Sequence, residues 1–504
     1  MPRARLVLPL LALGILIALA PARADSLHDQ RSALCTRYAA QLAELSDWCQ
    51  ERQVDGAAEQ LKAWLPTRAA DQLTLFVLPS TAAAPAKTST DEPEWRTKWL
   101  VLRGEQADAL VALAKRAGAE RHWSLAFELI TEAVRENPEQ AEGRRILGYA
   151  RFRDAWHTPF EIRQLNANKV WHETFGWLPK TYVERYEKGQ RYYQGRWVST
   201  DEETRLRSDI ARGWRVESEH YVVTTNHSLE EGVRLARRLE MLFAIWQQVF
   251  LPYEAGEADL VKRFAGRAPR HEPKQHNVTY YRTRQEYQDA LRAAQPQIEM
   301  SLGVYFDSTR TAYFFAGADQ EPGTLYHEAT HQLFHETRKV APAVAHEQNF
   351  WIVEGIACYM ESLDEHPGYC TLGGLNAGRM PAARHRLLED KFYVPLAELV
   401  KLNMESLQRD PRIAPLYSQS AGLADFLMHD AQGRYRDALV RYLEAIYTGH
   451  DTMSTLAELC GVSYATLDEQ YRAFMTSSET APTAEKADSA TEVTEGTEKS
   501  KKAT

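Results

Sequence analysis

Two histidines and a glutamate stand at a spacing that suits a metal-dependent hydrolase. His327, Glu328 and His331 form the run His-Glu-Ala-Thr-His. On a helix, residues four apart leave the same face one turn apart, so both imidazoles can bind one Zn²⁺ at about 2.0–2.1 Å. Glu328 directly follows the first histidine, where its carboxylate can take a proton from a water that the metal activates. The run predicts a zinc site, although five residues also fit a helix with ordinary surface or core histidines.

A third ligand is expected because a catalytic zinc is held by three protein side chains and keeps its fourth position for water. A third histidine in the pattern HExxHxxGxxH is excluded, since Phe334 stands at the glycine position and Thr337 at the last histidine. Glu354 is the one acid in an otherwise apolar run, Phe350 to Met360. A carboxylate buried in such a helix is costly unless a cation or a donor meets it, and a zinc ion would do so.

The two segments together resemble the gluzincins, zinc peptidases in which HExxH and a glutamate from a second helix hold the metal. The spacing from His331 to Glu354 and the pattern Trp351-x-x-Glu-Gly-x-Ala-x-Tyr carry this resemblance. Thr324-Leu-Tyr-His-Glu-Ala-Thr-His-Gln-Leu is similar, more closely, to the peptidase-MA-like families of secreted bacterial proteins. The resemblance runs over about residues 214–475. It implies a zincin-like domain, Zn²⁺ as cofactor, a peptide or protein substrate and Glu328 as general base, with the metal ligands His327, His331 and Glu354.

One position departs from the thermolysin-like relatives. Those proteins carry an aspartate four residues after the glutamate ligand, where it orients a zinc histidine, and here that position is Cys358. Glu361, Asp364 or a backbone carbonyl remains to orient the histidines, and the sequence leaves the three open.

An oxyanion donor is also needed, and in this class it is often a Tyr or His on a later helix. Tyr417, in Leu416-Tyr-Ser-Gln-Ser-Ala-Gly422, is the candidate, because similar families carry a Tyr-x-x-Ser element at this point. The alternative is a core aromatic. His335, one turn beyond His331, can contact substrate or lie at the surface, and Tyr326 is expected to be structural.

The composition is that of an ordinary globular protein. With 504 residues, 44% hydrophobic and 26% charged, the chain can form two to three domains with substantial cores. The net charge of −9 gives no basic footprint, so we expect no nucleic-acid partner.

The amino terminus has the pattern of a secretory signal peptide. Arg3 and Arg5 precede an apolar stretch, Leu6 to Ala20, and Ala22-Arg-Ala24 is a small-x-small cleavage site. The stretch of about 15 residues is short for a membrane span, which needs roughly 20. We therefore expect export to the periplasm or beyond after a cut behind Ala24, and no membrane span in the mature chain. An uncleaved anchor is the alternative.

Five cysteines permit disulfides in an exported protein. Cys35 and Cys49 would lie about 21 Å apart on one continuous helix, beyond bridging distance, and can pair only if the chain turns back between them. Cys358 and Cys370 can pin the end of the ligand helix, and Cys460 is left over. Free thiols throughout are the alternative.

The hydrophobic patterns predict an α+β fold: a mainly helical amino-terminal region, a zincin-like domain with a mixed sheet and active-site helices, and a helical carboxyl-terminal subdomain. Helices are expected over 31–65, 95–156 and 229–250, and strands over 220–225 and 277–282. Residues 303–306 and 311–315 flank a predicted hairpin turn. The resemblance implies that a strand of this hairpin is the edge that binds an extended substrate by β-augmentation.

The predicted organisation has seven parts. They are the signal peptide (1–24), an amino-terminal helical region (25–79), a linker (80–94), a second helical region (95–156), a connecting module rich in Trp, Tyr, Arg and Lys (157–213), the metallopeptidase-like domain (214–475) and a disordered tail (476–504). Within the second helical region, small residues around Pro138 resemble one tetratricopeptide unit, with a generic helical hairpin as the alternative.

These observations predict an exported zinc metallopeptidase whose amino-terminal helices offer a surface for a protein partner. Two alternatives remain. One is a catalytically inactive gluzincin-like binding protein on a helical scaffold, and the other is a zinc hydrolase acting on cell-wall peptide cross-links.

Overall fold

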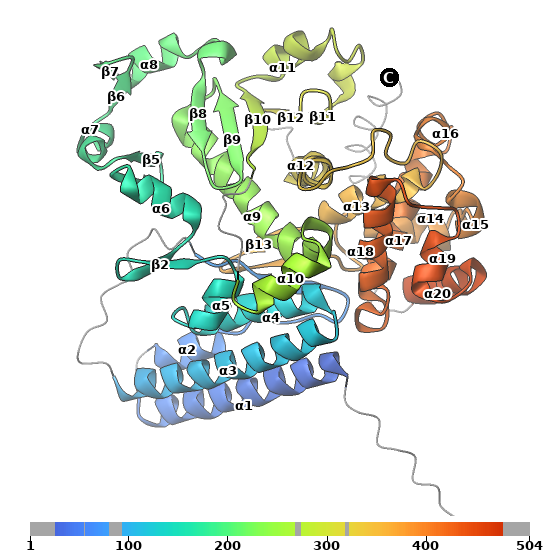
Figure 1. Ribbon diagram of the computed structural model, residues 1–504, viewed down its shortest axis with the longest axis horizontal. Helices are drawn as coiled ribbons and strands as arrows, with labels where there is room; N and C mark the ends of the chain where they lie inside the picture. Colours follow the sequence, from blue (N-terminus) through green and yellow to red (C-terminus); the bar gives the residue numbers. More distant parts are fainter. Residues whose placement is uncertain (1–25, 55, 80–92, 268–273, 318–321, 477–504) are drawn as a thin grey trace, which may run out of the picture.

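The computed structural model describes residues 26–54, 56–79, 93–267, 274–317 and 322–476 (Figure 1). The predicted signal peptide, most of the predicted linker and nearly all of the predicted tail lie outside these residues. Within them the protein combines helices with small sheets, in agreement with the α+β class. Helices from the amino-terminal half occupy one end of the molecule, and the five-stranded sheet and the carboxyl-terminal helices lie beside one another at the other (Figure 1).

Five helices make up the amino-terminal part: α1 (Leu27–Glu51), α2 (Ala57–Lys62), α3 (Glu94–Ala119), α4 (Trp123–Glu136) and α5 (Ala141–Ile146). A capping box formed by Ser26 and Asp29 starts α1. The helix ends well before the predicted residue 65. Gly56, with φ of +70°, takes a left-handed conformation that L side chains adopt rarely, and the chain turns there into α2. Helix α3 packs on both α1 and α4.

A short strand ties this part to the rest of the chain. Strand β1 (Leu73–Phe76) pairs antiparallel with β14 (Tyr369–Leu372), which itself forms a hairpin with β13 (Asp364–His366). The predicted helical region 25–79 therefore also contains a strand. Its partner lies about 300 residues further along, so no local pattern in the sequence marks the pairing.

The connecting module is a threefold repeat, which the sequence analysis did not detect. Three β-hairpins follow one another, and each leads into a helix. The elements are β2 (Ala150–Phe152), β3 (Ala155–His157), α6 (Pro159–Asn166), β4 (Lys169–His172), β5 (Gly176–Pro179), η1 (Lys180–Tyr182), α7 (Val183–Glu187), β6 (Gln190–Tyr193), β7 (Arg196–Ser199) and α8 (Thr200–Leu206). Trp156, Trp177 and Trp197 each occupy the second position of the returning strand.

The larger sheet has the strand order β11-β12-β10-β9-β8. Its strands are β8 (Trp214–Glu217), β9 (Tyr221–Thr225), β10 (His276–Tyr281), β11 (Val304–Phe306) and β12 (Thr311–Phe315), and η2 (Ile210–Arg212) precedes them. The three central strands are parallel, and the edge strands β8 and β11 run antiparallel to their neighbours. The predicted strands and hairpin are confirmed, with Arg310 in a left-handed conformation in the turn.

Long helices cover this sheet and carry the candidate site. They are α9 (Leu229–Glu254), α12 (Pro322–Glu336), α13 (Phe350–Met360), α17 (Ile413–Gly433) and α18 (Arg436–Thr448). Phe334 of α12 packs between Trp246 and Phe250 of α9, with ring centroids 5.3 and 5.1 Å away. This aromatic contact fixes the site helix against the longest helix of the domain.

Shorter helices complete the chain. They are α10 (Glu257–Phe264), α11 (Arg284–Leu291), η3 (Ile298–Met300), α14 (Met380–Leu388), α15 (Leu396–Leu399), α16 (Met404–Gln408), α19 (Thr455–Cys460) and α20 (Tyr464–Thr476). Among the helices described, none has both the length and the apolar character needed to cross a bilayer.

All five cysteines are free thiols. Cys35 and Cys49 both lie on the uninterrupted helix α1, whose geometry keeps them apart. Cys370 is buried in β14 with its sulfur 3.5 Å from the sulfur of Met241, and it does not bridge to Cys358.

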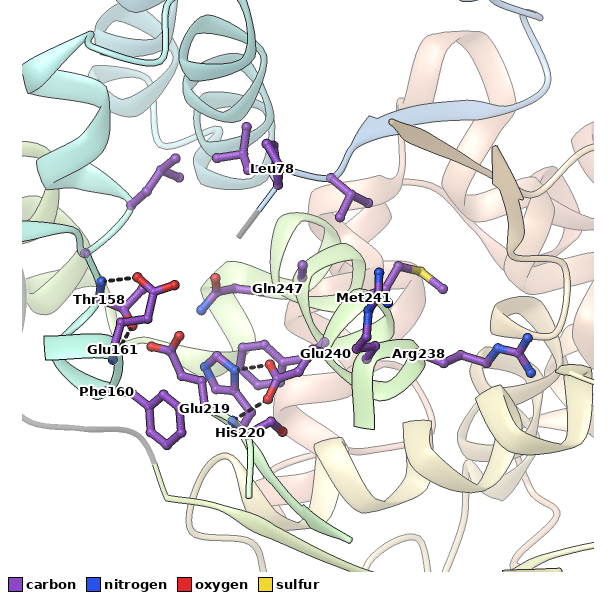
Figure 2. Close-up of a pocket in the computed structure, with 18 of the residues that line it drawn as sticks. Leu78, Thr158, Phe160, Glu161, Glu219, His220, Arg238, Glu240, Met241 and Gln247 are labelled. Atoms are coloured by element: carbon purple, nitrogen blue, oxygen red, sulfur yellow. Dashed lines mark hydrogen bonds and ion pairs between the residues drawn. The ribbon is translucent and has the colours of Figure 1, made fainter. Parts of the chain in front are cut away.

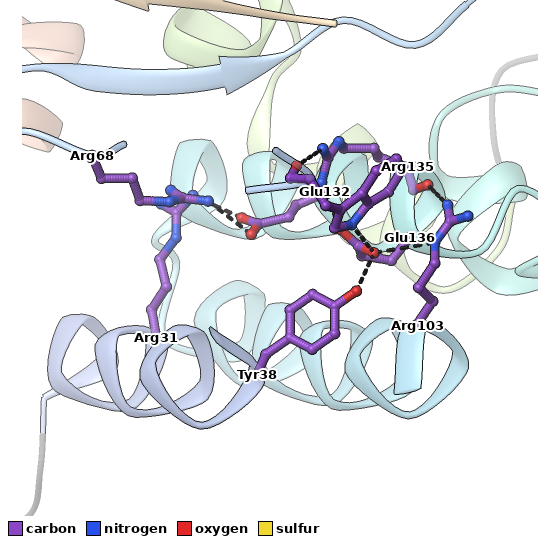
Figure 3. A network of polar contacts seen from close by, with 8 residues as sticks. Arg31, Tyr38, Arg68, Arg103, Glu132, Arg135 and Glu136 are labelled. Atoms are coloured by element: carbon purple, nitrogen blue, oxygen red, sulfur yellow. Dashed lines mark hydrogen bonds and ion pairs between the residues drawn. The ribbon is translucent and has the colours of Figure 1, made fainter. Parts of the chain in front are cut away.

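Buried charges on α4 hold the amino-terminal helices together (Figure 3). The carboxylate of Glu136 accepts hydrogen bonds from Tyr38 at 2.9 Å and from the indole of Trp64, and it lies beside Arg103 and Arg135. One turn earlier, Glu132 accepts from Arg31 and Arg68. Burial raises the pKa of Glu132, but the two arginines outweigh it and the pKa lies below its ordinary value. The carboxylates on this face of α4 are therefore matched by guanidinium groups.

Glu128, the next carboxylate on this face, joins the amino-terminal helices to the carboxyl-terminal subdomain. Its side chain, 3% exposed, lies between Arg31 of α1 and Arg436 of α18. Burial raises the pKa of Glu128, and the opposing charges of Arg436 and Arg31 bring it below the ordinary value. Close by, His122 contacts Asp437 at 2.6 Å. The site-bearing helices are thus anchored to α4 through charge pairs.

We expect Arg436→Met to lower the free energy of unfolding by about 3 kcal/mol, because removing one partner of a buried ion pair leaves Glu128 under-compensated. Urea unfolding followed by tryptophan fluorescence measures this. Arg441→Met, on the exposed face of the same helix, should change the value by less than about 0.5 kcal/mol. Equal midpoints for the two variants would show that the pair does not hold the two regions together.

Candidate metal centre

Helices α12 and α13 bring the three predicted metal ligands to one point. The Nε2 atoms of His327 and His331 lie 3.2 Å apart, and Oε2 of Glu354 lies 3.4 and 3.6 Å from them. The three residues are buried, with His331 the most exposed at 8%. The spacing of one helical turn thus places both imidazoles on one face, as the sequence predicts.

This donor set fits a zinc ion. Ligand atoms at about 2.0–2.1 Å from a tetrahedral zinc stand about 3.3 Å from one another, which is close to the three observed separations. Two imidazole nitrogens and one carboxylate oxygen are also ligands that suit zinc. His327, His331 and Glu354 would hold the ion and leave one position of the tetrahedron for other ligands.

A glycine allows the helix that carries Glu354 to pack closely against its neighbour. Gly355 faces the backbone of Ser420 on α17, and a Cβ atom at this position would come within 2.8 Å of the Ser420 carbonyl oxygen. Any larger residue would push α13 away from α17. The Glu-Gly pair in the sequence therefore combines a ligand with the close helix contact that positions it.

Glu361 orients His327. Its Oε1 lies 2.7 Å from Nδ1 of that histidine, and Arg379 binds the same carboxylate through two contacts of 2.8 Å. Burial raises the pKa of Glu361, but Arg379 and the hydrogen bonds from His327 and Arg379 hold it at about 2. An ionised carboxylate only accepts, so Nδ1 of His327 donates and the lone pair of Nε2 faces the other two ligands.

Of the three orienting groups that the sequence left open, Glu361 is therefore the one that contacts a ligand. Asp364 is exposed on β13. Cys358 lies next to this pair: its sulfur, a nitrogen of His327 and an oxygen of Glu361 are within 4.8 Å of one another. Burial raises the pKa of the Cys358 thiol. The sequence gave no direct signal for Arg379, which completes the arrangement from a loop after β14.

Glu328 is held with one oxygen bonded and the other unoccupied. Its Oε2 accepts the backbone N–H of Tyr305 at 3.0 Å. Within the described part of the chain, Oε1 has no hydrogen-bond partner although the residue is only 1% exposed. A buried carboxylate oxygen without a donor is costly, and it is available to accept a proton. Tyr305 belongs to β11, the edge strand of the sheet.

The structure places Tyr417 behind Glu361. It is buried in α17, and the guanidinium of Arg379 lies over its ring at 5.8 Å. Its role as an oxyanion donor remains a prediction. Tyr326 is part of the main core, as expected.

A second tyrosine, Tyr447 of α18, was not predicted. Its ring stacks on Phe334 and meets the ring of His335 at 5.3 Å. The hydroxyl is buried and has no hydrogen-bond partner among the described residues. Burial raises the pKa of Tyr447, and Tyr253, Glu354 and Tyr305 raise it further. Nothing in the local sequence distinguishes this tyrosine from the 22 others.

His335 forms part of the same wall. Its ring lies 5.8 Å from that of Tyr305 and beside Tyr447, and burial lowers its pKa to about 4. It is neutral at neutral pH.

Comparison with protein-family models, with curated proteins and with solved structures gave no match to this chain.

We expect Glu361→Gln to weaken zinc binding about 10- to 100-fold, because the amide no longer supplies the negative charge that fixes the tautomer and orientation of His327. Competition with a fluorescent chelator measures the affinity. Glu389→Gln, an exposed change just after α14, is the matched control and should leave the affinity unchanged. Equal affinity for both variants would mean that Glu361 does not support the metal.

Proposed function

We propose that this protein is an exported zinc-dependent peptidase of the gluzincin type. The observation that carries the proposal is the triangle of His327, His331 and Glu354 ligand atoms beside the unoccupied carboxylate oxygen of Glu328. The amino-terminal pattern of basic residues, apolar stretch and small-x-small site supports export.

Zn²⁺ held by the three ligands would polarise a scissile carbonyl and lower the pKa of a water. Glu328 is placed to take the water proton on Oε1 and to pass it to the leaving amine. The N–H of Tyr305 keeps Oε2 in place, so the base keeps one orientation throughout. The ion pair of Glu361 with Arg379 holds the imidazole of His327 against rotation.

The position of β11 favours an extended peptide as substrate. Its residues pair with β12 on one side, and in the described residues no strand pairs with the other. Tyr305 presents its N–H on the unpaired side, where Glu328 accepts it. A peptide that adds to this edge by β-augmentation would therefore run past the general base.

Tyr447 is the better-placed candidate for the oxyanion donor. Its buried hydroxyl without a partner stands among groups of the site, with Glu354 and Tyr305 acting on its pKa. A donor of this kind, held in a water-poor environment, stabilises the charge that develops on the carbonyl oxygen.

We expect Glu328→Gln to reduce hydrolysis of fluorescein-labelled casein by at least about 100-fold and to leave one zinc per chain, because the amide cannot accept the proton. Elemental analysis measures the metal. His331→Ala should lose both zinc and activity, and Glu347→Gln, an exposed change between α12 and α13, should keep both. If Glu328→Gln cleaves casein as the unmodified protein does, the proposal fails. Cleavage of cell-wall peptide fragments without cleavage of casein would change the substrate class and keep the chemistry.

A second prediction separates the two tyrosines. Tyr447→Phe should lower kcat about 100-fold with little change in KM, because the missing hydroxyl acts on the transition state. Tyr417→Phe, the matched change behind Glu361, should alter kcat by only a few-fold. Steady-state kinetics on one peptide substrate decides between them. The reverse order of effects would assign the donor role to Tyr417.

A further inference from the structure

A separate cavity of about 1040 Å³ lies where the amino-terminal part, the connecting module and the sheet region meet. We call it the junction cavity (Figure 2). Its walls come from the chain after β1, the start of α6, the β4–β5 hairpin, the β8–β9 turn, α9 and the β13–β14 hairpin. None of His327, Glu328, His331 and Glu354 lines it. Its size is that of a small-molecule site, and such sites often form at junctions of this kind.

Carboxylates line one part of this cavity. Glu161 lies at the start of α6, where its Oε2 accepts the backbone N–H of Thr158 at 3.0 Å. Glu240 of α9 accepts both the backbone N–H and the ring nitrogen of His220, at 2.6 and 2.7 Å. The carboxylate of Glu219 points into the open space between Thr158 and α9 (Figure 2).

The cations around the cavity are engaged elsewhere. Arg263 donates to the carbonyl of Ile146 at 2.7 Å, and Arg237 pairs with Glu173 at 2.9 Å. Arg234 pairs with Glu231 on its own helix. His220, the cation closest in sequence to Glu219, is already the partner of Glu240. No arginine or lysine is therefore printed against Glu219 by the fold itself.

Glu219 responds to this surrounding. Burial raises its pKa to about 7; the charges of Glu240 and Glu161 add to the rise, and His220 and a hydrogen bond from Thr158 oppose it. Near neutral pH the carboxyl is thus only partly ionised, and a cation that entered the cavity would complete its ionisation.

The remaining surface of the cavity is apolar. Phe160 and Trp177 meet edge to face with ring centroids 6.2 Å apart, and Leu78 and Met241 lie on other walls. Such a surface suits a methylene chain next to a charged head, and aromatic faces also attract ammonium groups. In the described residues the carboxylates here do not form a group tight enough to hold a metal ion, so the chemistry favours an organic cation.

We propose that the junction cavity binds an alkylammonium group, carried by a free polyamine or by a lysine side chain of a peptide, with Glu219 as its anionic partner. The ammonium head lies against Glu219 beside Glu161 and Glu240, and the methylene chain lies along Phe160 and Trp177. The proposal does not depend on the metal centre, because the two sites share no residue.

Isothermal titration calorimetry on the full protein at pH 7 tests this with four probes. Spermidine and acetyl-Ala-Lys-Ala-amide carry the ammonium group; 1,4-butanediol and acetyl-Ala-Gln-Ala-amide are their neutral counterparts. We expect at least one amine to bind and neither neutral probe to do so. Binding should release a proton from Glu219, so the measured heat should depend on the ionisation enthalpy of the buffer.

Glu219→Gln should weaken amine binding about tenfold or more and abolish the proton release. The variant should fold normally, since it replaces a buried carboxyl by a neutral group, and thermal melting checks this. Glu173→Gln is the matched control: this residue lines the same cavity, is largely exposed and pairs with Arg237, and the change should leave affinity within about twofold.

The result with the two amines identifies the source of the ammonium group: binding of spermidine alone indicates a free polyamine, and binding of the peptide alone indicates a lysine side chain. Absence of binding by both amines at millimolar concentration overturns the proposal, and so does amine binding that Glu219→Gln leaves unchanged.

Discussion

The constraint on which the centre depends is the burial of a carboxylate against two imidazoles. Glu354 lies in an apolar helix, 2% exposed, and faces the Nε2 atoms of His327 and His331. Such an arrangement is costly unless the oxygen meets positive charge. Much of the surrounding packing serves to impose it: Gly355 lets α13 approach α17, Phe334 fixes α12 against α9, and Glu361 fixes the ring of His327.

The amino-terminal part contributes to this framework more than its separate position along the chain indicates. Strand β1 extends the hairpin that follows the ligand helix, and Glu128 of α4 pairs with Arg436 of α18, the helix that carries Tyr447. Both contacts join segments about 300 residues apart. The amino-terminal helices are therefore part of the support of the centre, whatever further partner they bind.

The sequence predicted the parts of the molecule that depend on local patterns. The histidine spacing, the single acid in an apolar helix and the alternation around 303–315 each report their own element, and the structure brings the three ligands together. What it did not predict depends on distant segments. Arg379 reaches Glu361 from a loop, Tyr447 reaches the wall of the site from α18, and β1 finds its partner across most of the chain. The repeat of Trp156, Trp177 and Trp197 was present in the sequence, but its unit of about 20 residues has only a few defining positions.

Buried acids in this protein reach their stable state in different ways, and the comparison helps to interpret Glu354. Glu361 is ionised and bound by a guanidinium. Asp425 takes the opposite course: burial raises its pKa well above the ordinary value, so it stays protonated and needs no cation. Protonation suits Glu354 less well, because one proton on Oε2 can be donated to only one of the two nitrogens that face it. The Nδ1–H of His327 is already committed to Glu361, which leaves its Nε2 as an acceptor. A divalent cation satisfies both nitrogens and the oxygen at once, and the separations of 3.2 to 3.6 Å are those that it requires.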